Sequence, residues 1–249
     1  MNVAALIPAK GFTNAKQRLS PLLGVVEREL LAEAMLRDVL GQVVLTRGLD
    51  GVYVVTEDSK VSEIASFLGI HVIREESERG ETEAVVFALS KISQVGIHSV
   101  LVIPGDIPLV RSSDIELLLE QISGHDRDIP FALLTPSHDR MGTNALLLSP
   151  PGVIKLRFGY DSFSYHLGQV EAAGLPPRVL ENEMIALDID EPKDLERFME
   201  FAARVRGSCS PDEHDNRARA RIAAGNTYER AFKMGVFGAL ENAKRSGRL

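Results

Sequence analysis

The sequence predicts an α/β fold of the Rossmann-like class, with a mostly parallel β-sheet, helices on both faces and a C-terminal appended helix. Short, continuously apolar runs such as Val3–Ile7 and Ser99–Ile103 alternate with longer stretches whose apolar residues recur every three or four positions. The first pattern is typical of strands buried on both faces, and the second is typical of amphipathic helices. Their alternation indicates parallel strands joined by helical crossovers.

The expected elements follow one another along the chain. Strands are expected over Val3–Ile7, Gly51–Thr56, His71–Ile73, Ser99–Ile103, Phe131–Thr135, Asn144–Leu148 and Arg178–Leu180, and Ile185–Leu187 is expected to be a late strand that runs into Asp188. Helices are expected over Val25–Val44, Lys60–Leu68, Glu81–Val95, Ser113–Ile122 and Asp161–Ala173, and from Pro192 onward. Gly69 suits the end of a helix and Pro192 suits the beginning of one.

The composition changes after Arg206, and this change sets the expected domain boundaries. Residues 1–206 form the main domain, residues 207–226 form a polar linker, and residues 227–249 form a C-terminal helical extension. A helix over 227–245 places Tyr228, Phe232 and Val236 on one face. We expect that face to pack on the main domain or on another copy of the chain, which would make a homo-oligomer.

Charge, cysteine content and the N-terminus exclude several classes of protein. The net charge of −7 is unlike that of general nucleic-acid binders, which are usually basic. A single cysteine rules out a disulfide framework. The first apolar run spans only about five residues without a charged segment before it, so it is neither a signal peptide nor a membrane span. We therefore expect a cytoplasmic protein with no nucleic-acid or membrane partner.

Charged residues gather just after three of the expected strands. Cations follow the first strand and carboxylates follow the central and late strands: Lys10, Lys16, Arg18, Asp106, Asp188 and Asp190. The carboxyl ends of parallel strands meet at one edge of a sheet, where ligands bind in such folds. Carboxylates are the ligands that Mg²⁺ prefers, and lysines neutralise the phosphates that a metal does not reach. Each turn alone could be an ordinary turn or helix cap, but their coincidence favours a magnesium-polyphosphate site.

A second group of residues is typical of an anion site. Thr143 stands just before an expected strand, and Gly159 and Ser162 stand just before an expected helix. Thr143 and Ser162 offer hydroxyl donors, Gly159 leaves its backbone N–H approachable, and a helix N-terminus attracts negative charge. Two capped turns without chemical function are the alternative. The glycine-rich motifs of ATPase P-loops and of dinucleotide-binding folds are absent.

Five motifs in this order resemble one enzyme family. PAKGFTNAKQRL, PGDIPL, GTNALLL, FGYDSFSYH and ALDIDEPKDL are similar to motifs of the guanylyltransferases of deazaflavin coenzyme F-420 biosynthesis. The resemblance covers about residues 1–205. It implies a nucleotidyltransferase domain over 1–206, of the nucleotide-diphospho-sugar transferase type and similar to the molybdopterin-guanine dinucleotide synthases.

The resemblance also implies the reaction. A phosphorylated three-carbon acid attacks the α-phosphorus of GTP through its own phosphate oxygen, and pyrophosphate leaves. Family acceptors include phosphoenolpyruvate, 2-phospho-L-lactate and 3-phospho-D-glycerate. Two like-charged phosphates must approach one another, so one or two Mg²⁺ ions and several lysines are needed to offset the repulsion.

The family pattern assigns roles to residues of this chain. Lys16 and Asp106 are expected to be catalytic, and Asp106, Asp188 and Asp190 to hold Mg²⁺. The residues expected to bind GTP are Pro8, Ala9, Lys10, Lys16, Arg18, Thr82 and Glu83. Thr82 or Glu83 is assigned to the base because many relatives carry a Gly-Leu-Asn-like stretch where this chain has Gly80-Glu81-Thr82-Glu83. Thr143, Gly159 and Ser162 are expected to hold the acceptor.

Two other functions remain open from the sequence. A nucleotidyltransferase of the same fold could act on a sugar phosphate or a molybdopterin, which would need a wider acceptor cleft beside Thr143. A nucleotide-binding regulator without catalysis is the alternative outside the enzymes. The three metal-site aspartates favour catalysis, because nucleotide binding alone does not require them.

Overall fold

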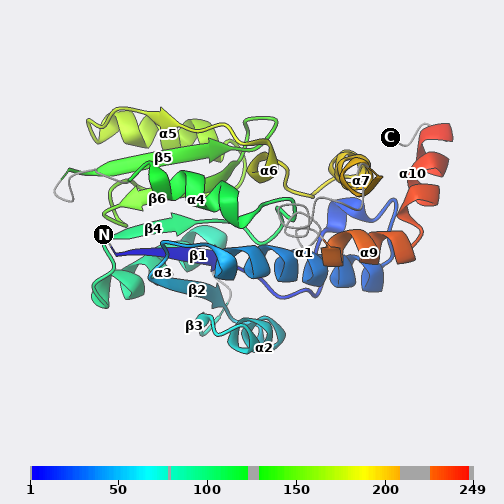
Figure 1. Cartoon of the computed structure of the whole chain (residues 1–249), viewed down its shortest axis with the longest axis horizontal. Helices are drawn as coiled ribbons and strands as arrows, with labels where there is room; N and C mark the ends of the chain where they lie inside the picture. The colour runs from blue at the N-terminus through cyan, green and yellow to red at the C-terminus, as the bar shows by residue number, and fades with distance from the viewer. Residues whose placement is uncertain (1, 78–79, 123–128, 208–224, 247–249) are drawn as a thin grey trace, which may run out of the picture.

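The computed structural model describes residues 2–77, 80–122, 129–207 and 225–246, and a seven-stranded β-sheet forms its centre (Figure 1). The strands are β1 (Val3–Pro8), β2 (Gly51–Thr56), β3 (His71–Arg74), β4 (Ser99–Val102), β5 (Phe131–Pro136), β6 (Thr143–Ser149) and β7 (Arg178–Val179). Their spatial order is β3-β2-β1-β4-β6-β5-β7. Every neighbouring pair is parallel except the pairs that β6 forms with β4 and β5. The predicted mostly parallel sheet is confirmed.

Helices cover both faces of this sheet, as predicted. They are α1 (Val25–Leu45), α2 (Ser59–Phe67), α3 (Glu81–Gln94), α4 (Ser112–Glu120), α5 (Ser162–Ala172), α6 (Glu183–Ala186), α7 (Pro192–Gly207), α9 (Gly225–Lys233) and α10 (Val236–Arg245). On one face, α1, α2 and α4 bury Leu40, Ile64 and Ile115. On the other face, α3 and α5 bury Leu89 and Val170. Within the described residues, no helix combines the length and the apolar character needed to cross a membrane.

β1 shows why a continuously apolar run forms a central strand. Ala4 and Leu6 face the core beneath α3, whereas Ala5 and Ile7 face the core beneath α1. Successive side chains of a strand point to opposite faces, so a strand covered on both faces must be apolar at every position. The loop after Pro8 then leaves the core and carries the predicted cations.

The direction of β6 places Thr143 at the edge of the sheet where β1 and β4 end, which we call the functional edge. Residues 137–142 alone connect β5 to β6, and so short a connection joins only antiparallel strands. Within the β4–β6 pair, Val102 near the end of β4 lies opposite Leu146 near the start of β6. The first residue of β6 therefore lies at the same edge as the last residues of β1 and β4.

The late strand predicted over Ile185–Leu187 is wrong. This segment contains the end of the short helix α6, which Asn182 caps by accepting hydrogen bonds from the backbone N–H groups of Met184 (2.9 Å) and Ile185 (3.1 Å). Such a cap favours a helical turn, and an apolar run of three residues cannot distinguish a strand from a helix. The segment that carries Asp188 and Asp190 reaches the sheet edge by another route, because Ile189 N–H donates to the carbonyl oxygen of Asp106 (3.1 Å).

The C-terminal extension forms two helices where one was expected over 227–245. α9 and α10 are separated at Gly235, whose φ of +68° is a left-handed conformation that glycine adopts without strain. Ala231, Val236 and Leu240 of these helices share one hydrophobic cluster with Phe198 of α7, so the extension packs on the main domain of its own chain. Residues 208–224 of the predicted linker 207–226 lie outside the described residues.

A buried carboxylate on α1 holds the start of α9, which lies alongside α1 (Figure 1). Asp38 is only 3% exposed. Asp38 Oδ1 accepts hydrogen bonds from the backbone and side-chain amides of Asn226 at 3.1 and 2.8 Å. Asp38 Oδ2 accepts hydrogen bonds from the backbone amide and hydroxyl of Thr227 at 2.8 and 2.7 Å. These neutral donors replace the water that the buried carboxylate has lost.

Candidate active site

The loop after β1 brings Lys16 to the functional edge of the sheet. At Gly11, a Cβ atom would lie 2.6 Å from Asp58 Oδ2. Asp58 is held in place, because its other carboxylate oxygen accepts a hydrogen bond from Val61 N–H (2.9 Å) at the start of α2. The close approach therefore requires glycine at position 11. Lys16 has a left-handed backbone (φ 51°, ψ 46°) directly before a short 3₁₀-helix over Gln17–Leu19.

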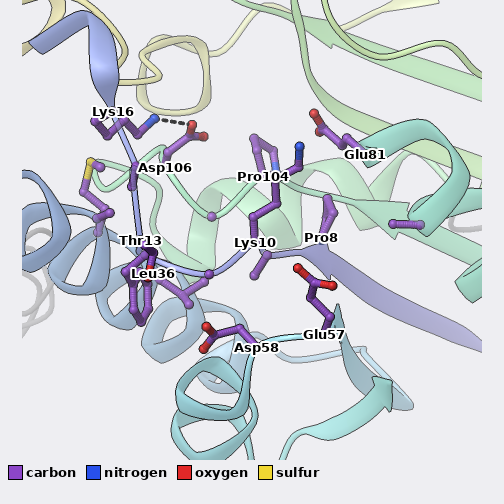
Figure 2. Close-up of a pocket in the computed structure, with 18 of the residues that line it drawn as sticks. Pro8, Lys10, Thr13, Lys16, Leu36, Glu57, Asp58, Glu81, Pro104 and Asp106 are labelled. Atoms are coloured by element: carbon purple, nitrogen blue, oxygen red, sulfur yellow. Dashed lines mark hydrogen bonds and ion pairs between the residues drawn. The ribbon is translucent and has the colours of Figure 1, made fainter. Parts of the chain in front are cut away.

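Lys16 forms ion pairs with two predicted carboxylates, of which Figure 2 shows the pair with Asp106. Its Nζ lies 2.6 Å from Asp106 Oδ2 and 2.6 Å from Asp190 Oδ1, and its side chain is 10% exposed. Burial by itself would lower the pKa of Lys16, but the negative charges of Asp106 and Asp190 and their hydrogen bonds outweigh it and raise the pKa above its ordinary value. The ammonium is therefore charged at neutral pH.

Asp188, the third predicted carboxylate, lies close to this pair but contacts a different partner. Its Oδ1 accepts a hydrogen bond from the side-chain amide of Asn144 (3.0 Å), at the start of β6. Burial raises the pKa of Asp188 to about 6, and the negative charges of Asp106 and Asp190 add to the increase. Lys16 lowers the pKa of Asp190 despite burial, but Asp188 has no such partner among the described residues and keeps a raised pKa.

Glu81, at the start of α3, belongs to the same group and was missed by the sequence analysis. Burial raises its pKa to about 7, and the charge of Asp106 raises it further, against the opposing effect of Lys10. Sequence reasoning assigned the neighbouring residues Thr82 and Glu83 to this loop. The available signal was an acidic residue directly after Gly80 at the first position of a helix expected to begin at the same sheet edge.

A pocket of about 790 Å³ opens beside Lys16. Six of the predicted residues line it: Pro8, Ala9, Lys10, Lys16, Asp106 and Asp190. Glu57, Asp58 and Glu75 also line it, from the ends of β2 and β3, and were not predicted. Figure 2 shows Glu57 and Asp58 on the Lys10 side of the pocket and Asp106 beside Lys16. One wall of the pocket is therefore acidic, while the loop after β1 supplies its lysines.

Three residues predicted to bind GTP are not among those that line this pocket. Arg18 lies at the surface and pairs with Glu191, with 3.4 Å between Arg18 Nη1 and Glu191 Oε1. Thr82 Oγ1 accepts a hydrogen bond from Phe158 N–H (2.9 Å), so it links α3 to the loop before α5. Glu83 is exposed on the first turn of α3. Contact of these residues with GTP stays a prediction.

The predicted metal ligands do not form a closed set of ligands on their own. Among the described residues, no group of three or more Asp, Glu, His or Cys side chains has the arrangement of a metal site. The ammonium of Lys16 lies between Asp106 and Asp190, and Asp188 faces Asn144. The chemistry of the donors nonetheless suits a hard cation, because all three are carboxylates whose mutual repulsion a divalent ion would relieve.

The structure brings together the three residues predicted to hold the acceptor. Thr143 N–H donates to Ser162 Oγ (3.0 Å), and Ser162 N–H donates to the carbonyl oxygen of Gly159 (3.2 Å). Gly159 has a φ of +100°, and a Cβ atom there would meet nothing within 4 Å. Ser162 begins α5, so both hydroxyls stand at a helix N-terminus. These residues do not line the 790 Å³ pocket.

Solved structures show which fold this is. A protein from Desulfovibrio desulfuricans G20 described as a nucleotide-diphospho-sugar transferase superposes with a TM-score of 0.70 at 17% identity, covering 97% of this chain and 98% of that one. A cytidylyltransferase from Leptospira borgpetersenii superposes with a TM-score of 0.57 at 17% identity, covering 94% of both chains. At this identity the likeness shows the nucleotidyltransferase-like fold alone.

Curated relatives are more similar in sequence. A phosphoenolpyruvate guanylyltransferase of Rubrobacter xylanophilus is 38% identical over 198 residues, which are 80% of this chain and 94% of the relative. That of Conexibacter woesei is 34% identical, over 84% of this chain and 93% of the relative. A 2-phospho-L-lactate guanylyltransferase of Methanothermobacter thermautotrophicus is 34% identical, over 87% of this chain and 97% of the relative. Because the family described as guanylyl transferase CofC like also matches residues 3–205, this chain belongs to the CofC-like guanylyltransferase family.

Proposed function

We propose that the protein transfers the guanylyl group of GTP to the phosphate of a three-carbon acid, with release of pyrophosphate, in the cytoplasmic biosynthesis of coenzyme F-420. Family membership supports this reaction, as do relatives named for phosphoenolpyruvate and for 2-phospho-L-lactate. The proposed acceptor is phosphoenolpyruvate, 2-phospho-L-lactate or 3-phospho-D-glycerate. These acids differ by little more than a hydroxyl and a double bond, so a few side chains of the acceptor site decide among them.

The placement of Lys16 carries this proposal. A charged ammonium between Asp106 and Asp190 stands at the border of a pocket of about 790 Å³, a volume within the usual range for small-molecule sites. Pro8, Ala9 and Lys10 line the same pocket and are proposed to hold GTP. Lys16 is proposed to exchange one carboxylate partner for a phosphate of the nucleotide, which is what an electrostatic catalyst of phosphoryl chemistry requires.

Asp106, Asp188 and Asp190 are proposed to hold one or two Mg²⁺ ions. Their fit rests on the donor set, which is all carboxylate, and on the pKa of Asp188, which burial raises and the negative charges of Asp106 and Asp190 raise further. When bound, Mg²⁺ supplies positive charge that neutralises the reacting phosphates. Asn144 orients Asp188 through the hydrogen bond to its Oδ1 (3.0 Å) and so fixes one proposed ligand before a metal binds.

The acceptor site is proposed to lie at Thr143, Gly159 and Ser162. The two hydroxyls and the N-terminus of α5 provide donors for a phosphate or carboxylate. An oxygen of the acceptor phosphate forms a bond to the α-phosphorus of GTP, and the bond from that phosphorus to the bridging β-phosphate oxygen breaks. Pyrophosphate departs with the electron pair. No general base is needed, since a phosphate monoester has a second pKa of about 6 and is ionised at neutral pH.

Pyrophosphate release by the purified protein tests the proposal. GTP and Mg²⁺ would be supplied with each of the three acids in turn, and ATP would replace GTP as the nucleotide control. Release with GTP and one acid is the expected result and identifies the acceptor. Release only with a sugar phosphate would make the protein a nucleotidyltransferase of another specificity. Binding of GTP without turnover on any acceptor would contradict catalysis.

A further inference from the structure

His166 in α5 has both ring nitrogens engaged, although no step described above uses it. The residue is 0% exposed. His166 Nδ1 lies 2.9 Å from Thr143 Oγ1, and His166 Nε2 accepts a hydrogen bond from Arg157 N–H at 3.2 Å. Phe158 contacts the imidazole edge to face, with ring centroids 5.3 Å apart. The ring is therefore held between the start of β6 and the loop before α5.

The backbone partner of Nε2 determines the tautomer of His166. An amide N–H can only donate, so Nε2 must be an unprotonated acceptor. Burial lowers the pKa of His166 to about 4, and the positive charge of Arg157 lowers it further, so the ring is neutral at pH 7. A neutral imidazole carries one ring proton. That proton must therefore lie on Nδ1, which donates it to Thr143 Oγ1.

The direction of this hydrogen bond decides what Thr143 can offer to a ligand. Because Thr143 Oγ1 accepts from His166, the hydroxyl proton of Thr143 cannot point at the imidazole and is directed elsewhere. The hydroxyl proton of Ser162 is likewise not used in its contact with Thr143, because Ser162 Oγ accepts a hydrogen bond from Thr143 N–H at 3.0 Å. Both hydroxyls can therefore donate hydrogen bonds beside the N-terminus of α5. An anion accepts such hydrogen bonds.

We propose that His166 is a positioning residue that orients the Thr143 hydroxyl as a donor toward the phosphate or carboxylate of the acceptor. This inference rests on the proposed function and assigns His166 to acceptor affinity. With the opposite tautomer, Thr143 would donate to His166 and present its oxygen lone pairs to the acceptor, which would repel it. His166 is completely buried, so it does not contact the acceptor itself and acts on it through Thr143.

Steady-state kinetics of four variants test this role. His166→Leu removes the donor and is expected to raise KM for the acid about 10-fold or more, because hydrogen bonds to charged groups are strong, with KM for GTP nearly unchanged. His166→Asn places an amide N–H near the position of Nδ1 and is expected to restore most of the affinity. Thr143→Val keeps the shape of the side chain and is expected to match His166→Leu. His98→Leu is the matched control, since His98 is exposed before β4.

The double variant His166→Leu, Thr143→Val separates action through Thr143 from a general packing role. If His166 acts through Thr143, the second substitution adds little to the effect of the first. Fold-changes that multiply would overturn the proposal, as would an unchanged KM for the acid in His166→Leu. Failure of the wild-type protein to turn over any acid would instead contradict the proposed function itself.

The tautomer can also be measured without turnover. A ¹⁵N–¹H correlation spectrum of the histidine side chains in the full chain would report which ring nitrogen of His166 is protonated. A protonated Nδ1 with an unprotonated Nε2 is the expected result, with His166→Asn identifying the signal. A protonated Nε2 would overturn the proposal, because Thr143 would then be the donor in its contact with the ring.

Discussion

The protein holds buried carboxylates in two contrasting environments. Asp38 accepts four hydrogen bonds from neutral groups of Asn226 and Thr227. At the sheet edge, Asp106, Asp188, Asp190 and Glu81 crowd around Lys16, and Asp106, Asp190 and Glu81 line an open pocket. The first carboxylate is fully satisfied by its own chain, whereas the others repel one another.

This difference separates a structural carboxylate from functional ones. Neutral donors around Asp38 replace lost water and fasten the C-terminal extension to α1. Burial, followed by the charges of the neighbouring carboxylates, raises the pKa values of Asp188 and Glu81 to about 6 and 7. A carboxylate whose pKa is raised in this way reduces stability when it is ionised. Such carboxylates are typical of sites that bind a charged ligand. Removal of a carboxylate charge should therefore change stability with opposite signs in the two regions.

The largest effect is expected for Lys16→Ala, which removes the cation at the centre of the crowded cluster. Loss of one preorganised electrostatic group lowers turnover by about 10²–10³-fold, so kcat/KM for pyrophosphate release should fall by that amount. Stability should also fall, by about 1 kcal/mol or more, because the Lys16 side chain is only 10% exposed and its removal leaves Asp106 and Asp190 without their cation. Lys233→Ala, on the exposed face of α9, is the control and should retain wild-type turnover.

A smaller but clear loss of stability is expected for Asp38→Ala. This substitution leaves the amides of Asn226 and Thr227 without their acceptor, and the free energy of unfolding should fall by about 1–3 kcal/mol. Urea unfolding at pH 7 measures the change. Glu241→Ala, at an exposed position of α10, should leave the unfolding midpoint in place. A midpoint in Asp38→Ala that equals the wild type would show that α9 does not depend on this carboxylate.

Glu81→Gln is expected to increase the free energy of unfolding, which is the opposite of the change expected for Asp38→Ala. The folded-state pKa of Glu81 is about 7, above the ordinary value of 4.5. The folded protein therefore binds a proton more tightly than the unfolded chain, and the charge of Glu81 costs stability above pH 7. At pH 8 without divalent ions, Glu81→Gln should raise the free energy of unfolding by about 1–3 kcal/mol.

The pH dependence makes this prediction specific. Between pH 7 and 4.5, wild-type Glu81 becomes protonated in the folded state, so the advantage of Glu81→Gln should disappear by about pH 4.5. Glu83→Gln is the matched control on the same helix turn, where the side chain is exposed. A gain of stability that is equal at pH 8 and pH 4.5 would contradict the proposed cause.

The smallest effect on stability is expected for Arg18→Ala. Arg18 and Glu191 form an exposed pair at 3.4 Å, and such pairs contribute about 0–1 kcal/mol. KM for GTP distinguishes the two roles of this residue. An increase would support the predicted contact with the nucleotide phosphates. A value equal to that of the wild type would restrict Arg18 to the surface pair with Glu191.

Much of the fold follows from local patterns that can be recognised directly in the sequence. The apolar runs of β1 and β4 and the periodic stretches of α1 and α3 are long enough to identify their elements, and their ends lie within about two residues of the predicted positions. The late strand failed for the same physical reason: an apolar run of three residues has no measurable period, and the Asn182 cap decided in favour of a helix.

The candidate site shows a similar division. Lys16 and Asp106 were identified because charges that follow apolar strands meet at one sheet edge, and they do meet there. Asp190 meets them as well, although the late strand from which its position was predicted is not a strand. Glu81, Glu57 and Asp58 were missed because an acidic residue near a helix start looks the same whether it faces solvent or a pocket. The role of His166 was hidden as well, since its partners are a side chain 23 residues away and a backbone amide nine residues away.

The sequence alone therefore determined the α/β class, the order of the strands and helices up to β7, and the chemical identity of the groups at the ends of the strands. Tertiary structure alone decided the antiparallel direction of β6 and the placing of Lys16 between two carboxylates. It also decided the tautomer of His166 and the fastening of α9 to Asp38. The physical reason is distance along the chain. Periodicity and capping act over a few residues, whereas charge crowding, burial and hydrogen-bond direction depend on groups up to 189 residues apart that meet only after folding.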